Sequence, residues 1–361
     1  MMLKTVADIP AEALRGKRVL VRVDWNVPQE NGKITNDFRI QSSLATLRLL
    51  QEAGAQVTAI THLGDDGSAD ITPVRERALA LLPGIEVLEN VRRSEGELAN
   101  DAEFAQSLAK NFNLFVNDAF AVCHRAHASV VGVPQYLPSY AGLLVAKETA
   151  ELSRAFNPDR PFIFILGGAK FSTKAPLIKK FLGLADKIFI GGALANTCFK
   201  ALGYEIGQSV ADENVELVKP LVTDPRIMLP ATVITVIEGK TLVRTAATVS
   251  SDAKIVDVAP ETLEEITDYI KSAKLVLWNG PLGNFEAGFM TGTEAMARII
   301  AEASAYSIIG GGDTIAAVER LGALDKFNFV STGGGAMLDF LAEGTLPGLE
   351  ALKQSQEKFK L

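Results

Sequence analysis

The sequence predicts an α/β protein with two halves, each built on a parallel β-sheet. Short apolar runs alternate with helical patterns along nearly all of the 361 residues, and this alternation is typical of right-handed βαβ units. Four glycine clusters follow apolar runs in the second half, whereas all three histidines lie in the first half. We therefore expect the two halves to carry different binding sites.

The strands of the first half are predicted at residues 19–23, 56–61, 86–88 and 114–116. Between them, a helix capped by Asp37 is expected to reach Leu50 and to end at Gly54, because its apolar positions follow the helical period. Further helices are predicted at residues 71–82 and 101–110, the second with Asn100 as its cap.

A long helix predicted at residues 142–156 is the expected connector, since Asn157-Pro158 ends it. Strands follow near residues 162–166, 187–190, 274–278, 306–309 and 327–331, and residues 227–246 read as a smaller β element with a turn at Glu238-Gly239. The expected organisation is a first lobe of residues 1–140 with the tail 345–361, a connecting helix at 141–157 and a second lobe at 158–344.

Composition indicates an ordinary globular protein. Apolar residues make up 48% and charged residues 22% of the chain. The formal net charge of −7 argues against nucleic acid or an anionic membrane as the main partner, because both favour basic surfaces. No signal segment or membrane-length apolar run is visible, so we expect a cytoplasmic protein. Cys123 and Cys198 are expected to be buried, reduced thiols.

Polar side chains follow the predicted strands of the first half. Asp24 and Asn26 come directly after residues 19–23, Arg39 begins the next helix, and His62 and Arg125 follow later strands. Because the carboxyl ends of parallel strands share one edge of a sheet, these side chains are expected to converge. Arginine and histidine donors suit a phosphate or carboxylate. The alternative is that they are surface charges and turn residues.

The glycine loops of the second half predict a nucleotide site, because glycine lets the backbone approach a phosphate and a following helix offers free N–H groups. Lys170 and Lys174 stand beside Gly167-Gly168 and suit a polyphosphate, although the P-loop spacing is absent and a solvated pair is the alternative. Glu286 is a candidate acceptor for ribose hydroxyls. Asp313 is a candidate Mg²⁺ ligand, unless it only caps its helix.

Together these motifs resemble the phosphoglycerate kinase family over nearly the whole chain. The matching blocks follow the family's order: Arg22 to Pro28, His62 to Gly64, Glu89 to Arg92, Asn117 to Phe120, His124 to Ser129, Leu166 to Lys170, Trp278 to Glu286, Gly310 to Thr314 and Ser331 to Gly335. The resemblance implies two Rossmann-like, doubly wound parallel-sheet lobes joined by a long helix, with the tail returning to the first lobe. It also implies closure of the lobes during catalysis and a monomeric enzyme.

The implied reaction moves a phosphoryl group reversibly between 1,3-bisphosphoglycerate and ADP, giving 3-phosphoglycerate and ATP with Mg²⁺. The implied phosphoglycerate ligands are Asp24, Asn26, Arg39, His62, Arg125 and Arg160. The implied nucleotide ligands are Gly168, Ala169, Lys170, Lys174, Gly192, Asn279, Pro281, Glu286, Gly311, Gly312, Asp313 and Thr314, with Asp313 on the metal. Arg39, Lys170, Gly312 and Gly335 are the implied catalytic residues.

The chain departs from the family after His62-Leu63-Gly64. The family usually has Arg-Pro there, whereas this chain has Asp65-Asp66-Gly67 and a shorter segment up to Glu89. An aspartate near a phosphate would repel it unless the loop points it away, and Arg92 or Arg93 is a candidate substitute for the missing cation. Ala193 and Ala259 also replace usual glycines in the nucleotide half.

Three interpretations remain open. The first is an active phosphoglycerate kinase, and the second is a related nucleotide-binding protein in which Asp65 impairs or alters substrate use. The third is a kinase for another small carboxylate or acyl phosphate. A NAD-dependent dehydrogenase is not favoured, because no G-x-G-x-x-G follows the first strand.

Overall fold

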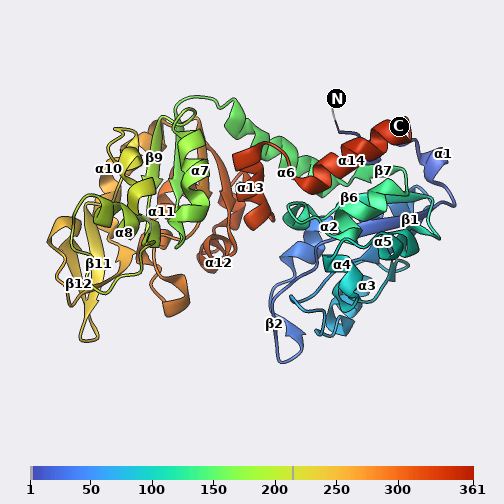
Figure 1. Cartoon of the computed structure of the whole chain (residues 1–361), viewed down its shortest axis with the longest axis horizontal. Helices are drawn as coiled ribbons and strands as arrows, with labels where there is room; N and C mark the ends of the chain where they lie inside the picture. Colours follow the sequence, from blue (N-terminus) through green and yellow to red (C-terminus); the bar gives the residue numbers. More distant parts are fainter. Residues whose placement is uncertain (1–2, 214) are drawn as a thin grey trace. The chain divides into compact units, whose positions relative to one another are not determined.

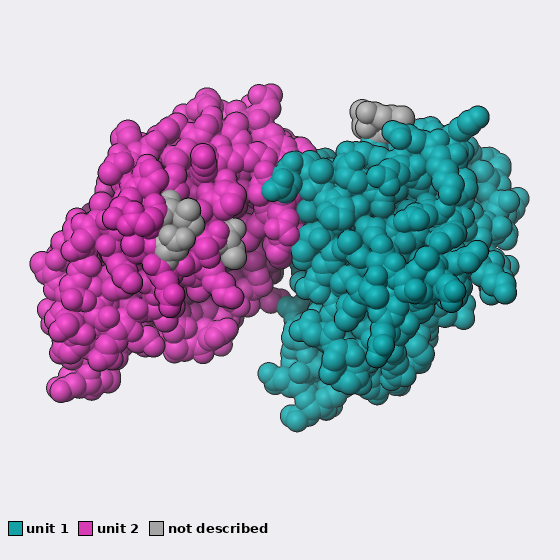
Figure 2. Space-filling model, in the orientation of Figure 1, with its two compact units in different colours: residues 1–150, 343–361 teal, residues 151–342 magenta. Residues whose placement is uncertain are grey.

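The computed structural model describes residues 3–213 and 215–361, apart from the side chains of 173 and 217. The chain forms two compact units (Figure 2). Unit 1 consists of Met1–Ala150 and Glu343–Leu361, and unit 2 consists of Glu151–Ala342. Among the described residues, no helix is long and apolar enough to cross a membrane.

Unit 1 contains a five-stranded parallel sheet in the order β5-β4-β1-β6-β7. Its strands are β1 (Arg18–Val23), β4 (Gln56–Ile60), β5 (Glu86–Val87), β6 (Leu114–Asp118) and β7 (Ser139–Ala141). The central strand β1 is buried on both faces after its first residue, which explains its nearly continuous apolar run. A short hairpin, β2 (Gln29–Glu30) and β3 (Lys33–Ile34), follows β1.

The helices of unit 1 connect these strands as the alternating pattern predicts. They are α1 (Ala11–Leu14), α2 (Phe38–Glu52), α3 (Thr72–Leu81), α4 (Glu95–Leu98), α5 (Ala102–Ala109), α6 (Leu143–Ser153) and α14 (Pro347–Lys358). The prediction of Asn100 as the cap of α5 is wrong. Asp101 is the cap, and its carboxylate accepts the N–H of Phe104 at 2.8 Å. Asn100 instead has a φ of +50°, so the chain turns there before the helix begins.

Unit 2 contains a six-stranded parallel sheet in the order β10-β9-β8-β14-β15-β16. Its strands are β8 (Phe162–Leu166), β9 (Lys187–Ile190), β10 (Ile227–Met228), β14 (Leu275–Asn279), β15 (Tyr306–Gly310) and β16 (Phe329–Val330). The helices of the unit are α7 (Phe171–Phe181), α8 (Gly192–Ala201), α9 (Lys219–Val222), α10 (Leu263–Ser272), α11 (Thr291–Glu302), α12 (Gly312–Arg320) and α13 (Gly335–Glu343).

The smaller β element predicted in the second half is confirmed as part of a second sheet. β11 (Thr232–Ile237) pairs antiparallel with β12 (Lys240–Thr245) and with β13 (Lys254–Val258). The turn between β11 and β12 has positive φ at both Glu238 and Gly239, as a tight hairpin requires. This sheet packs against α8 through an apolar cluster that includes Phe199 and Val233 (Figure 1).

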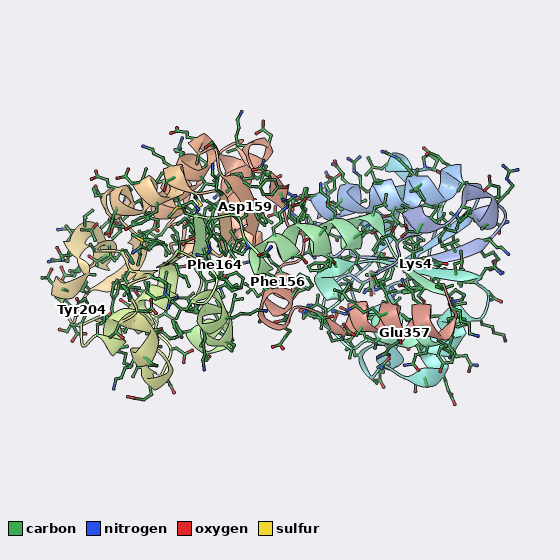
Figure 3. The ribbon with its side chains drawn as sticks, turned by 90° about the horizontal axis from the view of Figure 1, so that it is seen from above. Lys4, Phe156, Asp159, Phe164, Tyr204 and Glu357 are labelled. Carbon is green, nitrogen blue, oxygen red and sulfur yellow. The ribbon has the colours of Figure 1, made fainter. Side chains whose placement is uncertain are left out.

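The predicted connector is the helix α6, which continues as a 3₁₀ turn over Arg154–Phe156. The division between the units falls inside this helix, after Ala150. The carboxyl-terminal helix α14 packs beside β7 in unit 1 (Figure 1). The side-chain amide of Gln356 accepts the N–H of Lys4 at 3.0 Å and donates to the C=O of Lys4 at 2.9 Å. Figure 3 labels Lys4 and Glu357, the residue that follows Gln356. The tail is therefore part of unit 1.

Candidate active site

The loops after β1 and β4 meet at the carboxyl edge of the unit 1 sheet. Trp25, which is fully buried, donates its backbone N–H to Thr61 and its indole N–H to Ser43. The side-chain oxygen of Asn26 accepts the N–H of Gly64 at 3.1 Å. These bonds fix the two loops against each other and place Asp24, Asn26 and His62 in one region, as the strand pattern predicts.

Asp24 holds Arg39 and lies close to His62. Its Oδ2 accepts a hydrogen bond from Arg39 Nη1 at 2.6 Å, and its Oδ1 lies 3.7 Å from His62 Nδ1. The Asp24 side chain is buried, whereas 33% of the Arg39 side chain remains exposed. Arg39 is therefore held in place by a carboxylate while part of its guanidinium stays available to a ligand.

His62 lies inside a cluster of arginines. Burial is the largest cause that lowers its pKa far below the usual value, and Arg22, Arg92, Arg125 and Arg39 lower it further, in that order. A neutral His62 follows, which can donate one hydrogen bond without adding charge. Arg22 is itself buried, donating to Ser129 Oγ at 2.8 Å and lying 3.2 Å from His62 Nδ1.

Arg92 belongs to this cluster, although the sequence suggested it only as a substitute for a missing arginine. It lies in the 3₁₀ turn after β5, and its Nη1 donates to the carbonyl of Gly64 at 2.6 Å and to Asp65 Oδ1 at 3.0 Å. Its Nε and Nη2 are buried and have no hydrogen-bond partner among the described residues. The matching block Glu89 to Arg92 was the signal that could have identified it.

The buried carboxylates around the cluster are already engaged. Glu97, which is fully buried, accepts hydrogen bonds from the Ser129 N–H at 2.8 Å and from Ser129 Oγ at 2.6 Å. Asp24 is paired with Arg39. Four arginines thus face two buried carboxylates in the described part of this site, so the region is suited to an anion with several negative charges.

Arg160, which the resemblance implies as a phosphoglycerate ligand, lies in unit 2, and that role stays a prediction. Arg160 precedes β8 in unit 2, at the amino end of that strand. It donates to Asp186 at 2.7 Å and to the carbonyl of Leu184 at 3.1 Å. The structure therefore ties Arg160 to the edge of unit 2 opposite its glycine loops.

Unit 2 has a cavity of about 350 Å³ at the carboxyl edge of its large sheet. Six of the residues predicted to bind nucleotide line it: Gly168, Ala169, Gly192, Pro281, Glu286 and Asp313. The wall of the cavity opposite the large sheet contains residues that the sequence did not predict. That wall comes from α8 and from the small antiparallel sheet, and includes Asn196, Phe199 and Val256 as well as Ala193, where the family usually has glycine.

Glycine is required where the loops of unit 2 meet. A Cβ at Gly167 would overlap the carbonyl of Pro281. The N–H of Gly168 donates to that same carbonyl at 3.2 Å, and the N–H of Gly192 donates to the carbonyl of Leu282 at 3.1 Å. The loops after β8, β9 and β14 therefore bond directly through their backbones, which builds a firm floor for the cavity.

Lys174 lies beside this floor. Its Nζ donates to the carbonyl of Gly167 at 2.5 Å, and burial lowers the pKa of the amine to about 8. Lys170 is exposed at the start of α7. The structure thus brings both lysines to the glycine loop after β8. Lys174 is hydrogen-bonded to a backbone carbonyl of this loop, and Lys170 lies at the surface.

The remaining predicted residues lie at the ends of β14, β15 and β16. A Cβ at Gly311 would lie 3.4 Å from Thr314 Oγ1 and 3.6 Å from Asn279 Nδ2, so these three residues are neighbours. The oxygen Thr314 Oγ1 is buried and has no hydrogen-bond partner among the described residues. Gly312 and Gly335 begin α12 and α13, which places two helix amino ends on this edge.

Asp313 does not cap α12, because the cap position is Gly311. Its carboxyl faces the cavity, where burial and the nearby Glu286 raise its pKa, in that order. Two carboxylates that share a cavity favour a cation between them. Mg²⁺ is typically held by one or two carboxylates together with substrate phosphates, so this donor set fits a magnesium–nucleotide complex.

Comparisons with known proteins identify the family of the chain. The family model of phosphoglycerate kinase matches residues 7–84 and 76–344. Phosphoglycerate kinases of Dictyoglomus turgidum and Thermus thermophilus are each 42% identical, over alignments of 396 and 392 residues that cover 98% and 97% of this chain and 100% of each relative.

Solved structures give the same result. The phosphoglycerate kinase of Pyrococcus horikoshii matches with a TM-score of 0.88 and 30% identity, covering 99% of this chain and 100% of that chain. The enzyme of Coxiella burnetii matches with a TM-score of 0.86 and 35% identity, covering 98% and 99%. The chain therefore belongs to the phosphoglycerate kinase family.

Proposed function

We propose that this phosphotransferase binds phosphoglycerate on unit 1 and the magnesium–nucleotide complex on unit 2, and moves a phosphoryl group between 1,3-bisphosphoglycerate and ADP. The observation that carries the proposal is the excess of arginine around the neutral His62. A substrate with a carboxylate and a phosphate supplies the negative charge that this cluster lacks. The cavity of unit 2, with its glycine floor, supports the assignment of the nucleotide.

The residues of unit 1 have distinct roles in this proposal. Arg39, Arg92 and Arg125 bind the charged groups of the substrate, while His62 and Asn26 add uncharged hydrogen-bond donors. Asp24 positions Arg39 through their 2.6 Å ion pair. Because phosphoryl transfer depends on in-line positioning and positive charge more than on covalent help from the protein, holding the carboxyl acceptor rigidly is the main contribution of this unit.

The residues of unit 2 hold and polarise the nucleotide. Lys170 and Lys174 carry positive charge beside the glycine loop after β8, and the helix amino ends at Gly312 and Gly335 add backbone N–H groups directed at the phosphates. Asp313 would hold Mg²⁺, which neutralises charge on the phosphates when it is bound. Glu286 accepts hydrogen bonds from the ribose, and Asn279 and Thr314 position the loops around the phosphates.

A coupled assay tests this function. We expect the enzyme to form 1,3-bisphosphoglycerate from 3-phosphoglycerate and ATP in the presence of Mg²⁺. Lys170→Ala should lower kcat at least about a hundredfold, because it removes a positive charge that stabilises the phosphoryl group during its transfer. Lys179→Ala, an exposed lysine on the same helix, is the matched control and should retain activity.

Absence of turnover in the unchanged enzyme, with nucleotide binding intact by calorimetry, would contradict the proposed reaction. Full activity in Lys170→Ala would contradict only the role of that lysine. We further propose that the enzyme works as a monomer, which light scattering across a range of protein concentrations would check.

A further inference from the structure

A short acidic loop lies against Arg92 in unit 1. It follows His62-Leu63-Gly64 and contains Asp65 and Asp66. Asp65 carries the carboxylate that pairs with Arg92, at 3.0 Å from Nη1. The two partners differ sharply in environment, because 96% of the Asp65 side chain is exposed but only 2% of the Arg92 side chain is. The loop therefore brings a solvated negative charge to a buried positive one.

The loop is fixed in this position by Gly67. This residue has a φ of +76°, and a Cβ on it would overlap the carbonyl group of Arg92 itself. The backbone of the loop thus packs directly on the backbone of the 3₁₀ turn that carries Arg92. Only glycine allows this approach, so Asp65 is held beside Arg92 rather than directed away from it.

Arg92 does not need Asp65 to stay in place. Its Nη1 also donates to the carbonyl of Gly64 at 2.6 Å. The turn around it is fixed separately by Asn90, whose side chain donates to the carbonyl of Leu63 at 2.7 Å and accepts the N–H of Arg92 at 3.1 Å. Loss of the Asp65 charge would leave all three of these bonds intact.

We propose that Asp65 is an internal anion that competes with the phosphorylated carboxylate substrate for Arg92 and so lowers the affinity of unit 1 for it. This inference rests on the proposed function, and it adds a residue that tunes the substrate site. Arg92 has two buried N–H groups that lack partners among the described residues, and Arg125 lies close enough to disfavour its charge. The arginine cluster therefore has an excess of positive charge, and Asp65 neutralises part of it when no substrate is bound.

The expected effect follows from the ion pair between Asp65 and Arg92. Because the substrate must take Arg92 from this largely exposed carboxylate, the pair weakens binding by about threefold to tenfold. Asp65→Asn should accordingly tighten the binding of 3-phosphoglycerate by about that factor. The gain should shrink as salt is raised, because the Debye length shortens.

The experiment is isothermal titration calorimetry of the full-length enzyme with 3-phosphoglycerate at low and high salt. Asp66→Asn is the matched control, because it removes the same charge one residue away from a carboxylate that bonds Ser68 instead of Arg92. We expect Asp66→Asn to change the affinity less than twofold. Titration with magnesium and ADP serves as a second control, since its site lies in unit 2 and should be unaffected.

A second background makes the test specific to Arg92. In an Arg92→Ala enzyme, Asp65→Asn should no longer tighten binding, because the group for which Asp65 competes is gone. Unchanged or weaker binding in Asp65→Asn alone would overturn the inference, and so would equal gains from Asp65→Asn and Asp66→Asn. Failure of every variant and of the unchanged enzyme to bind 3-phosphoglycerate would overturn the proposed function, and the inference with it.

Discussion

The carboxylate of Asp118 accepts a hydrogen bond from the backbone N–H of Leu144, at 2.9 Å, in the first turn of α6. Asp118 ends β6 and is fully buried. Gly142 packs directly on this carboxylate, and a Cβ at that position would overlap it. The neighbouring N–H of Leu143 donates to Thr46 Oγ1 at 2.8 Å. The connecting helix is thus anchored to the sheet and to α2 at its first two residues.

This anchor predicts a pH-dependent stability. Burial raises the pKa of Asp118 from 3.8 to about 7, so between these values the folded protein holds a proton that the unfolded chain releases. The free energy of unfolding should therefore fall as pH rises from about 4 to 7, by at most about 1.4 kcal/mol per pH unit from this group. Asp118→Asn should lack this contribution.

Urea unfolding at several pH values measures the difference between the two proteins. The free energy of unfolding of the unchanged protein, minus that of Asp118→Asn, should decline from pH 5 to pH 7 and then stay level. Glu12→Gln, which changes an exposed carboxyl of unit 1, is the control for the loss of one carboxyl. A constant difference for Asp118→Asn would show that its pKa is the same in both states.

The adjacent arginines in the 3₁₀ turn after β5 provide a second prediction. Arg92 is buried within the cationic cluster, whereas Arg93 is about half exposed and pairs with Glu89 at 3.0 Å. Arg92→Ala should raise the KM for 3-phosphoglycerate at least about tenfold, because a charge-assisted contact is lost, whereas Arg93→Ala should change it less than twofold. Steady-state kinetics with both substrates varied would decide this, and equal effects of the two changes would refute it.

A third prediction concerns Lys174. Since the pKa of its amine is lowered to about 8 by burial, the free enzyme loses this charge as pH rises above 8. The affinity for ADP should then decline by up to about tenfold per pH unit. Lys174→Arg should remove the decline, because arginine stays protonated. Fluorescence titration from pH 6.5 to 9.5 would test this, with Lys179→Arg expected to behave as the unchanged enzyme.

A fourth prediction concerns Asp313 and magnesium. Asp313→Asn should abolish most of the tightening of ADP binding that Mg²⁺ produces, because a carboxylate ligand is lost. Binding of ADP without metal should be unchanged or slightly stronger, because a negative charge beside Glu286 is removed. Asp325→Asn, an exposed carboxyl paired with Lys326, is the control. Equal magnesium dependence in Asp313→Asn and in the unchanged enzyme would place the metal elsewhere.

Much of the fold could be predicted from sequence because most buried strands are short apolar runs and the longer helices keep their period. The parallel strands β8 and β14 are examples, and the antiparallel hairpin around Glu238 and Gly239 was recognisable from its turn. The short strand β7 and the helix α14 lack such a signal and were not predicted. The contacts of helix-capping residues were harder to predict from sequence. Asp37 precedes α2, but its carboxylate bonds Gln41 and Arg77, a choice that depends on a residue 40 positions away.

The candidate site was predictable where position along a strand decides position in space. Asp24, Asn26 and His62 follow strand ends and converge on one edge. Arg92 shows the limit, because it lies in a turn beyond the end of β5, and only the folded chain shows that it joins the arginine cluster around His62. The cavity wall formed by α8 and the small sheet depends on tertiary packing, which no local pattern contains.

The packing of α14 on β7 has a consequence for how the protein is made. The last residues of the chain complete a unit whose first strands were synthesised before any of unit 2, and Gln356 closes that unit by bonding Lys4. A ribosome therefore releases all of unit 2 before unit 1 can gain its final helix. Unit 1 is thus begun first in translation but cannot be completed until the last residues of the chain have been made.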